Sequence, residues 1–312
     1  MMQCAWYMDL PGPGRMRFQR RYGERFIETI LFAFAMASII IMLLIFYFLV
    51  REGLRAFVEV GTLNLVLGQK WHPAGDIYGI MPLIIDSLLI TTLALFINIS
   101  IGIPLSIYLA ELAGTREKDI LKPAIELLAG VPSIVYGFLG IIILVSYLQS
   151  SFDMLTGRSI IACSILLGIM FIPRMTTICE DSLRAVPWEF KEGSLALGAN
   201  EWQTIRHVTV PAASSGIIAA IILNIGSTIG ETMAALLVVG NVPRIPSPIF
   251  NIFGQGATFT SVIAGEMGEV SRGSLHYQAL FAVGLVLLVV VSILSVMADL
   301  IRARIQKKFG GY

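Results

Sequence analysis

Apolar residues occur along the chain in blocks of about 20 or more, and the stretches between the blocks gather charged residues, glycine and proline. The blocks fall at roughly 29–50, 82–110, 123–148, 159–178, 214–240 and 276–300. A helix of about 20 apolar residues crosses a hydrocarbon core about 30 Å thick. The pattern therefore predicts an all-α polytopic membrane protein with six transmembrane helices.

The composition supports this interpretation. Of the 312 residues, 56% are hydrophobic and 14% are charged, whereas a soluble domain carries roughly 25% charged residues. The formal net charge of +1 indicates no nucleic-acid partner. The cysteines show no CxxC spacing, so neither a disulfide framework nor a metal site is expected from Cys4, Cys163 and Cys179.

The distribution of basic residues predicts the orientation. If both termini are cytoplasmic, the inside segments are 1–28, 111–123, 174–212 and 301–312, and they hold 16 of the 22 Lys and Arg residues. This asymmetry agrees with the positive-inside rule. We expect a cytoplasmic N-terminal segment at 1–28, a membrane domain at 29–300 and a cytoplasmic tail at 301–312.

Motifs for chemistry are missing from the sequence. It contains no GxxxxGK[ST] motif, so we expect no P-loop binding of ATP. It also contains no HExxH or GxSxG motif, so we expect neither a zinc-protease site nor a serine-hydrolase site. The histidines are scattered at predicted span ends or in loops, at His72, His207 and His276. We expect a protein that is not an enzyme and that takes its energy from another chain or from an ion gradient.

The fifth block carries a row of polar residues. Asn224, Ser227, Thr228 and Glu231 are spaced i, i+3, i+4 and i+7, which places them on one face of a continuous helix, and Thr232 follows. An ionisable group at a helix centre costs about 2.5–3.5 kcal/mol on insertion scales and is a functional-site signal. We predict that these five residues line a substrate pathway.

Shorter polar rows occur on two other blocks. Thr91, Asn98 and Gly102 follow helical spacing on the second, and Glu126, Gly130, Ser133 and Gly137 follow it on the third. Close interhelical packing explains these rows adequately. Prolines predict bent or broken helices in the same two blocks, at Pro104, Pro123 and Pro132.

The longest cytoplasmic segment between spans, 180–213, predicts a helix–turn–helix. Pro187 suits the start of a helix, Gly198 suits its left-handed end, and Asn200 with Gln203 forms a capping-box pattern for a second helix. Pro211 interrupts the chain before the fifth span. The segment is either an amphipathic connector or a docking element for a cytoplasmic partner.

The same segment resembles the EAA signature of ABC-importer permeases, which reads EAA, three residues, Gly, nine residues, I-x-L-P. Glu192, Gly193 and Ser194 stand for EAA, Gly198 for the glycine, and Pro211 closes the motif after two valines. The resemblance implies that these five residues couple the chain to an ATPase, with ATP and Mg²⁺ bound there and no cofactor bound by this chain.

Further stretches resemble phosphate-specific ABC permeases of the PstC type: GETMAALLVVGN (230–241), AGVPSIVYGFLG (129–140), WHPAGDIYGIMP (71–82) and residues 260–287. This resemblance implies a type I, MetI-like importer permease in the cytoplasmic (inner) membrane. The implied partners are a second homologous permease, an ATPase dimer and an external phosphate-binding protein.

The chain departs from that family at Ser227, because its members commonly carry arginine four residues before the Glu of GET. Import of another oxyanion, such as molybdate or sulfate, is therefore an alternative, and a proton-coupled secondary transporter is a second one. Glu231 has two candidate roles: it accepts phosphate O–H groups, which sulfate lacks, or it pairs with an arginine of the partner permease.

Overall fold

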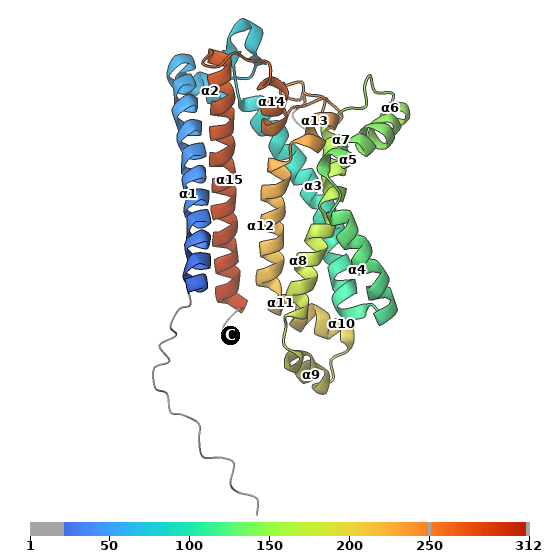
Figure 1. The fold of residues 1–312 in the computed structure, drawn as a ribbon. Helices are drawn as coiled ribbons and strands as arrows, with labels where there is room; N and C mark the ends of the chain where they lie inside the picture. Colours follow the sequence, from blue (N-terminus) through green and yellow to red (C-terminus); the bar gives the residue numbers. More distant parts are fainter. Residues whose placement is uncertain (1–21, 249–250, 310–312) are drawn as a thin grey trace, which may run out of the picture. The chain divides into compact units, whose positions relative to one another are not determined.

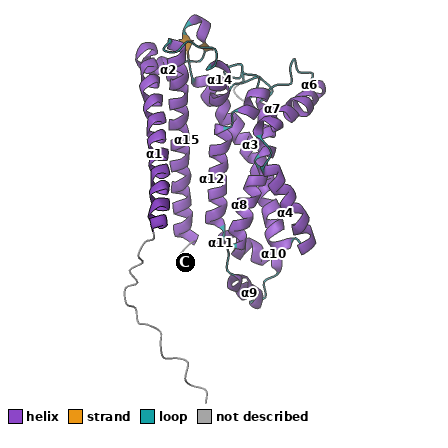
Figure 2. Ribbon diagram, viewed as in Figure 1, coloured by secondary structure: helices purple, strands orange, loops and turns teal. Residues whose placement is uncertain are grey.

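The computed structural model describes residues 22–248 and 251–309. They form helices joined by loops, apart from a small antiparallel sheet in which β1 (Trp71–His72) pairs with β2 (Ile77–Tyr78) across η2 (Pro73–Gly75) (Figures 1 and 2). Five of the described helices are long and apolar enough to cross a membrane, and a bent pair, Glu201–Ala212 with Ser214–Gly230, makes up to six. The all-α polytopic fold is confirmed.

The chain forms two compact units, residues 1–48 and 49–312. The described part of the first unit is the beginning of α1 (Tyr22–Ala56), which is strongly apolar from Phe26 onward. Most of the predicted N-terminal segment 1–28, with Cys4, and the last residues of the 301–312 tail lie outside the described residues. Every predicted pathway and coupling residue belongs to the second unit.

The second unit contains the end of α1, which continues into η1 (Phe57–Gly61) and α2 (Thr62–Leu67). Counted along the chain, the second span is α3 (Met81–Ile107) with η3 (Tyr108–Leu112). The fourth span is α7 (Ile160–Met170) with α8 (Ile172–Arg184), and the last span is α15 (Leu275–Phe309). Helix α3 packs along α7 and α8, and α12 (Ser214–Gly230) packs against α15, α8 and α3. Buried apolar side chains fill the spaces between these helices.

The third predicted span is broken, and its boundaries differ from 123–148. Helix α4 (Thr115–Ala129) is a separate element without buried residues, and the apolar span is Ser133–Ser151, formed by α5 (Ser133–Leu139), η4 (Gly140–Val145) and α6 (Ser146–Ser151). The break lies at Pro132, whose backbone is extended (φ −58°, ψ 139°) and which has no N–H to donate. Pro104, in contrast, lies inside the continuous helix α3.

The predicted cytoplasmic helix–turn–helix is present. It comprises α9 (Trp188–Ala196) and α10 (Glu201–Thr204), followed by η5 (Ile205–Thr209) and α11 (Val210–Ala212). The side chain of Asn200 accepts a hydrogen bond from the Gln203 N–H at 2.8 Å, and Gln203 Oε1 accepts one from the Asn200 N–H at 2.9 Å. The chain then bends by 65° at Ala213 into α12, which is followed by α13 (Met233–Val238) and α14 (Phe259–Glu266).

Gly198 makes the turn between α9 and α10, with a φ of +87° and no neighbouring atom within 4 Å of the place where a Cβ would lie. A substitution there therefore introduces backbone strain but no steric overlap. We expect Gly198→Val to destabilise the turn by about 1–2 kcal/mol, because left-handed backbone is unfavourable for residues with a Cβ.

Hydrogen exchange of the backbone amides at 188–205 measures this effect, and it should accelerate roughly 5- to 30-fold in the variant. Gly193→Ala is the matched control: Gly193 lies inside α9, also has no atom within 4 Å of its Cβ position, and gains helix propensity as alanine. Equal exchange in Gly198→Val and in the unaltered protein would contradict the assigned turn.

Candidate functional site

Two of the predicted pathway residues face the interior of the protein. Asn224 and Thr228 on α12 are buried; Asn224 Nδ2 donates to the sulfur of Met175 on α8 at 3.0 Å, and Thr228 Oγ1 donates to the Asn224 carbonyl at 2.8 Å. The Asn224 Oδ1 atom is buried without a hydrogen-bond partner among the described residues. These side chains join α12 to α8, whereas Ser227 remains partly exposed.

Glu231 lies at a break in the fifth span. Helix α12 ends at Gly230, the backbone of Glu231 is extended (φ −68°, ψ 128°), and α13 begins at Met233. The prediction of one continuous helix over 214–240, with Glu231 in helical phase with Asn224, is wrong in its last third. The physical reason is that side chains take over the backbone hydrogen bonds of the break.

Three hydrogen bonds that involve side chains stabilise that break. Glu231 Oε1 accepts from the Ala234 N–H at 3.2 Å, and the Glu231 carbonyl accepts from Thr260 Oγ1 of α14 at 2.7 Å. Thr232 Oγ1 donates to the Gly230 carbonyl at 3.2 Å. Irregular backbone at membrane depth is tolerated where it is buried in protein or lines a water-filled cavity.

The second carboxylate oxygen of Glu231 is available. Oε2 has no hydrogen-bond partner among the described residues, and the side chain is partly exposed. Glu231 therefore does two things: one oxygen caps the start of α13, and the other can accept a hydrogen bond from a bound molecule or from another chain.

The structure brings an arginine to Ser227 that the sequence interpretation missed. Arg174 on α8 donates through Nη1 to Ser227 Oγ of α12. The charge distribution along the sequence places Arg174 in the cytoplasmic segment 174–212, but α8 extends the fourth span to Arg184, so Arg174 lies within that span. Its position inside the predicted block 159–178 was the available signal.

The polar rows on the other spans serve packing. Asn98 Nδ2 donates to the Gly168 carbonyl at 3.3 Å, and a Cβ at Gly102 would lie 2.9 Å from Met175 Cγ. The break before α5 separates Gly130 from Ser133, so the third row shares no single helix face. Gly137 packs tightly against Leu237 of α13.

The predicted coupling residues lie on and around the cytoplasmic helix–turn–helix. Glu192 accepts from Trp188 Nε1 at 2.6 Å, and the hydroxyls of Ser194 and Thr204 are 3.0 Å apart, which joins α9 to α10. The remaining ones are the exposed Gly193, the turn residue Gly198, and Pro211 in α11. Pro211 lines a hollow of about 900 Å³ between the end of α8 and the start of α12.

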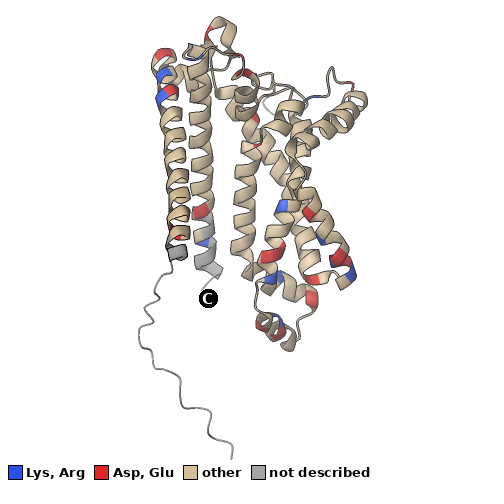
Figure 3. Cartoon of the chain, in the orientation of Figure 1, with Lys and Arg blue, Asp and Glu red and all other residues tan. Residues whose placement is uncertain are grey.

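Ion pairs tie this segment to the spans. Lys191 of α9 lies 2.7 Å from Glu111 at the end of the second span, and both side chains are only about a tenth exposed. Glu180 of α8, which is buried, pairs with Arg184 at 2.7 Å and with Lys122 of α4 at 3.4 Å. Figure 3 shows charged residues gathered around α4, α8, α9 and α10, with none on α12.

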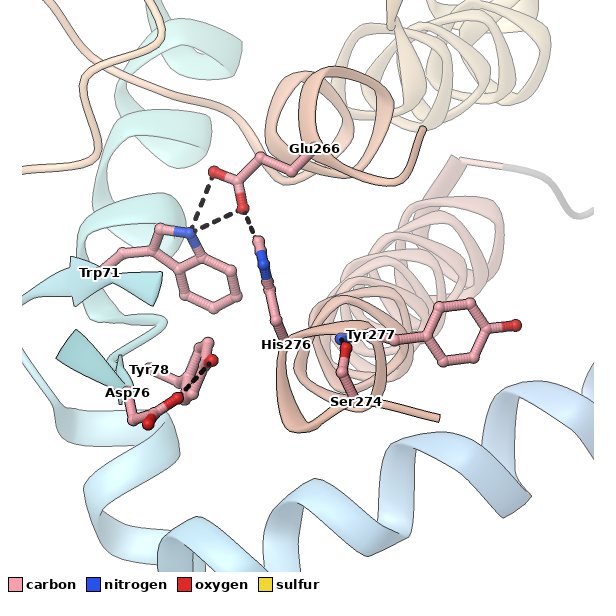
Figure 4. A network of polar contacts seen from close by, with 7 residues as sticks. All are labelled: Trp71, Asp76, Tyr78, Glu266, Ser274, His276 and Tyr277. Atoms are coloured by element: carbon pink, nitrogen blue, oxygen red, sulfur yellow. Dashed lines mark hydrogen bonds and ion pairs between the residues drawn. The ribbon is translucent and has the colours of Figure 1, made fainter. Parts of the chain in front are cut away.

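At the opposite ends of the spans, a polar network joins the β1–β2 loop to α14 and α15 (Figure 4). Trp71 Nε1 donates to both carboxylate oxygens of Glu266 at 3.1 Å, and His276 Nε2 lies 2.7 Å from Glu266 Oε2. Burial, with donation to Asp76 at 3.1 Å, raises the pKa of Tyr78 to about 12. The phenol therefore remains a hydrogen-bond donor at neutral pH.

Residues 102–309 match the family described as the binding-protein-dependent transport system inner membrane component. The chain is 36% identical over 277 residues to the probable ABC transporter permease protein YqgH of Bacillus subtilis, covering 88% of this chain and 89% of that protein. It is 28% identical over 315 residues to the phosphate transport system permease protein PstC of Haemophilus influenzae, covering 95% and 98%.

A chain in the crystal structure of a bacterial alginate ABC transporter has a similar fold, with a TM-score of 0.61, 15% identity, and coverage of 93% of this chain and 99% of that one. At this identity the likeness concerns the fold alone, and it agrees with the ABC-importer permease fold expected from the sequence. The match over two thirds of the chain and the relative at 36% identity carry the assignment. The chain belongs to the binding-protein-dependent transport system inner membrane component family, and it is a multi-pass, non-catalytic permease subunit of the inner membrane.

Proposed function

We propose that this chain is the permease subunit of an ATP-driven phosphate importer. Several relatives that it resembles over most of their length are named as phosphate transport permeases. The structural observation that carries the proposal is the broken fifth span, which places the carboxylate of Glu231, with one oxygen unoccupied, among polar groups between apolar segments. A site of this kind suits a cargo that both donates and accepts hydrogen bonds.

A permease of this family works with an ATPase and with a binding protein outside the membrane. In the proposed importer, the partners are a second homologous permease, two copies of the ATPase and an external phosphate-binding protein. ATP and Mg²⁺ bind to the ATPase subunits, and this chain contributes half of the translocation pathway.

Two connections lead from the cytoplasmic helices to the pathway. One runs along the chain from α10 through η5 and α11 into α12. The other is the ion pair between Lys191 of α9 and Glu111, which reaches the end of the second span directly. In this proposal, movement of the ATPase subunits shifts α9 and α10, and both α3 and α12 follow. Each state of the pathway must then contact the cargo differently for the energy of ATP to drive transport.

Phosphate import itself is tested in proteoliposomes that hold the complete transporter and its binding protein. We expect ATP-dependent uptake of labelled phosphate that continues when the proton gradient is collapsed and that sulfate and molybdate compete with weakly. Strong competition by either anion would assign the transporter to that oxyanion instead. Loss of uptake on collapse of the proton gradient would indicate a secondary transporter.

Glu231 is the residue that distinguishes phosphate from sulfate in this proposal. Phosphate at neutral pH carries O–H groups that the unoccupied Oε2 atom can accept, and sulfate carries none. An acceptor that loses its donor when sulfate occupies the site disfavours sulfate relative to phosphate. We expect Glu231→Gln to slow phosphate uptake roughly tenfold or more and to increase competition by sulfate, because the amide NH₂ can donate to either anion.

Glu231→Ala is the companion variant, because glutamine retains an oxygen to cap the Ala234 N–H and alanine does not. A normal uptake rate and selectivity in Glu231→Gln, with a defect only in Glu231→Ala, would reduce Glu231 to a capping residue. Loss of assembly in Glu231→Gln would instead indicate pairing with an arginine of the second permease.

The Lys191–Glu111 pair makes a separate prediction. Breaking a mostly buried pair leaves one charge uncompensated, at a cost of about 3–5 kcal/mol. We expect Lys191→Gln to retain basal ATP hydrolysis by the transporter but to lose most of its stimulation by the loaded binding protein. The pair of substitutions Lys191→Glu with Glu111→Lys should restore part of it. Arg116→Gln, at an exposed arginine of α4 without an ion pair in the described part, is the control.

A further inference from the structure

Arg174 lies inside the fourth span, away from both of its ends. It follows Ile160, where the fourth span begins, by 14 residues and precedes Arg184, where that span ends, by ten. At about 1.5 Å per residue, these separations correspond to roughly 21 Å and 15 Å along the helices. Ser227 lies 13 residues, or about 20 Å, from the start of α12. The two residues therefore meet inside the fourth span, close to the place where α12 ends at Gly230.

The Arg174 guanidinium has no compensating charge in the described part of the chain. None of the described residues places a carboxylate within ion-pair distance of it, and its hydrogen-bond partner there is the neutral hydroxyl of Ser227. Glu180, two turns further along α8, is already paired with Lys122 and Arg184. An arginine without a carboxylate partner inside a span is rare and is a signal of a functional site.

The contact with Ser227 leaves most of the guanidinium free. Ser227 Oγ donates to the Leu223 carbonyl at 2.9 Å, so its own hydrogen is used and its lone pairs face Arg174. Among the described residues, one of the five N–H groups of Arg174 is engaged, and the side chain is exposed in this chain. The remaining donors form a planar fork that matches two oxygens of a tetrahedral oxyanion.

We propose that Arg174, held in place by Ser227, is the cationic ligand for the transported oxyanion at the middle of the pathway. This assignment deepens the proposed function and rests on it for the identity of the anion. Glu231 follows Ser227 by four residues, just past the end of α12, so a hydrogen-bond acceptor lies close along the chain to the residue that holds this cation.

Chemical labelling tests this site without relying on transport. Phenylglyoxal reacts with accessible arginines, and its reaction with Arg174 is followed by mass spectrometry of the assembled transporter without its binding protein. We expect inorganic phosphate to slow labelling of Arg174 several-fold, and chloride at equal ionic strength to leave it unchanged. Arg206, exposed on η5, is the internal control, and its labelling should not respond to phosphate.

Uptake by variants provides the second arm. We expect Arg174→Gln to lower phosphate uptake at least tenfold and Arg174→Lys to lower it less. Arg174→Gln combined with Ser227→Arg should recover uptake, because the arginine at 227 supplies the cation from the facing helix. Co-purification of the other subunits verifies assembly of each variant. Recovery in the combined variant distinguishes a ligand from a residue needed only for folding.

The outcomes separate this inference from the proposed function. Protection of Arg174 by sulfate or molybdate, and not by phosphate, keeps the oxyanion site and overturns phosphate as the cargo. Phosphate uptake at the normal rate in Arg174→Gln overturns the site and leaves the importer intact. Labelling that no oxyanion slows, with no recovery in the combined variant, also overturns the proposal.

Discussion

A polar group at the depth of the hydrocarbon core must find its partner inside the protein, because lipid tails offer none. This constraint shapes the centre of the second unit. The Asn224 amide donates to the sulfur of Met175, and the Thr228 hydroxyl donates to the Asn224 carbonyl. The Asn98 amide donates to the Gly168 carbonyl of α7. The interruption after Gly230 persists for the same reason, since Thr260 and the Glu231 carboxylate replace the helical hydrogen bonds that are lost there.

The sequence predicted the elements whose causes are local. Runs of about 20 apolar residues marked the spans, and the Asn200–Gln203 box and Gly198 defined the cytoplasmic turn, because capping and left-handed backbone depend on neighbouring residues. It did not predict the end of α12, because the hydrogen bond that stabilises the break comes from Thr260, 29 residues away. The same limit applies to Arg174 and Ser227, which are 53 residues apart in the chain.

The centre of the chain also differs from its cytoplasmic side in how charge is handled. Near α4, α8 and α9, the buried Glu180 and Lys191 have partners of opposite charge, and these ion pairs connect the helices to one another and to the end of the second span. Arg174 of α8 has instead the neutral hydroxyl of Ser227 as its partner, and Ser227 belongs to a different helix, α12. A site divided between α8 and α12 changes its affinity whenever the spacing of the two helices changes, which is what release of cargo on one side requires.

The polar network of Trp71, Glu266 and His276 connects segments at the ends of the spans opposite to the α9–α10 helices. It fastens the β1–β2 loop, α14 and the start of α15 to one another through side chains, so these three segments hold a fixed arrangement before a partner arrives. Ordering of loops is one of the entropic penalties of complex formation, and it is smaller for a surface that is already ordered. In the proposed importer, a binding protein that contacts these segments meets a surface that side-chain hydrogen bonds tie to α15.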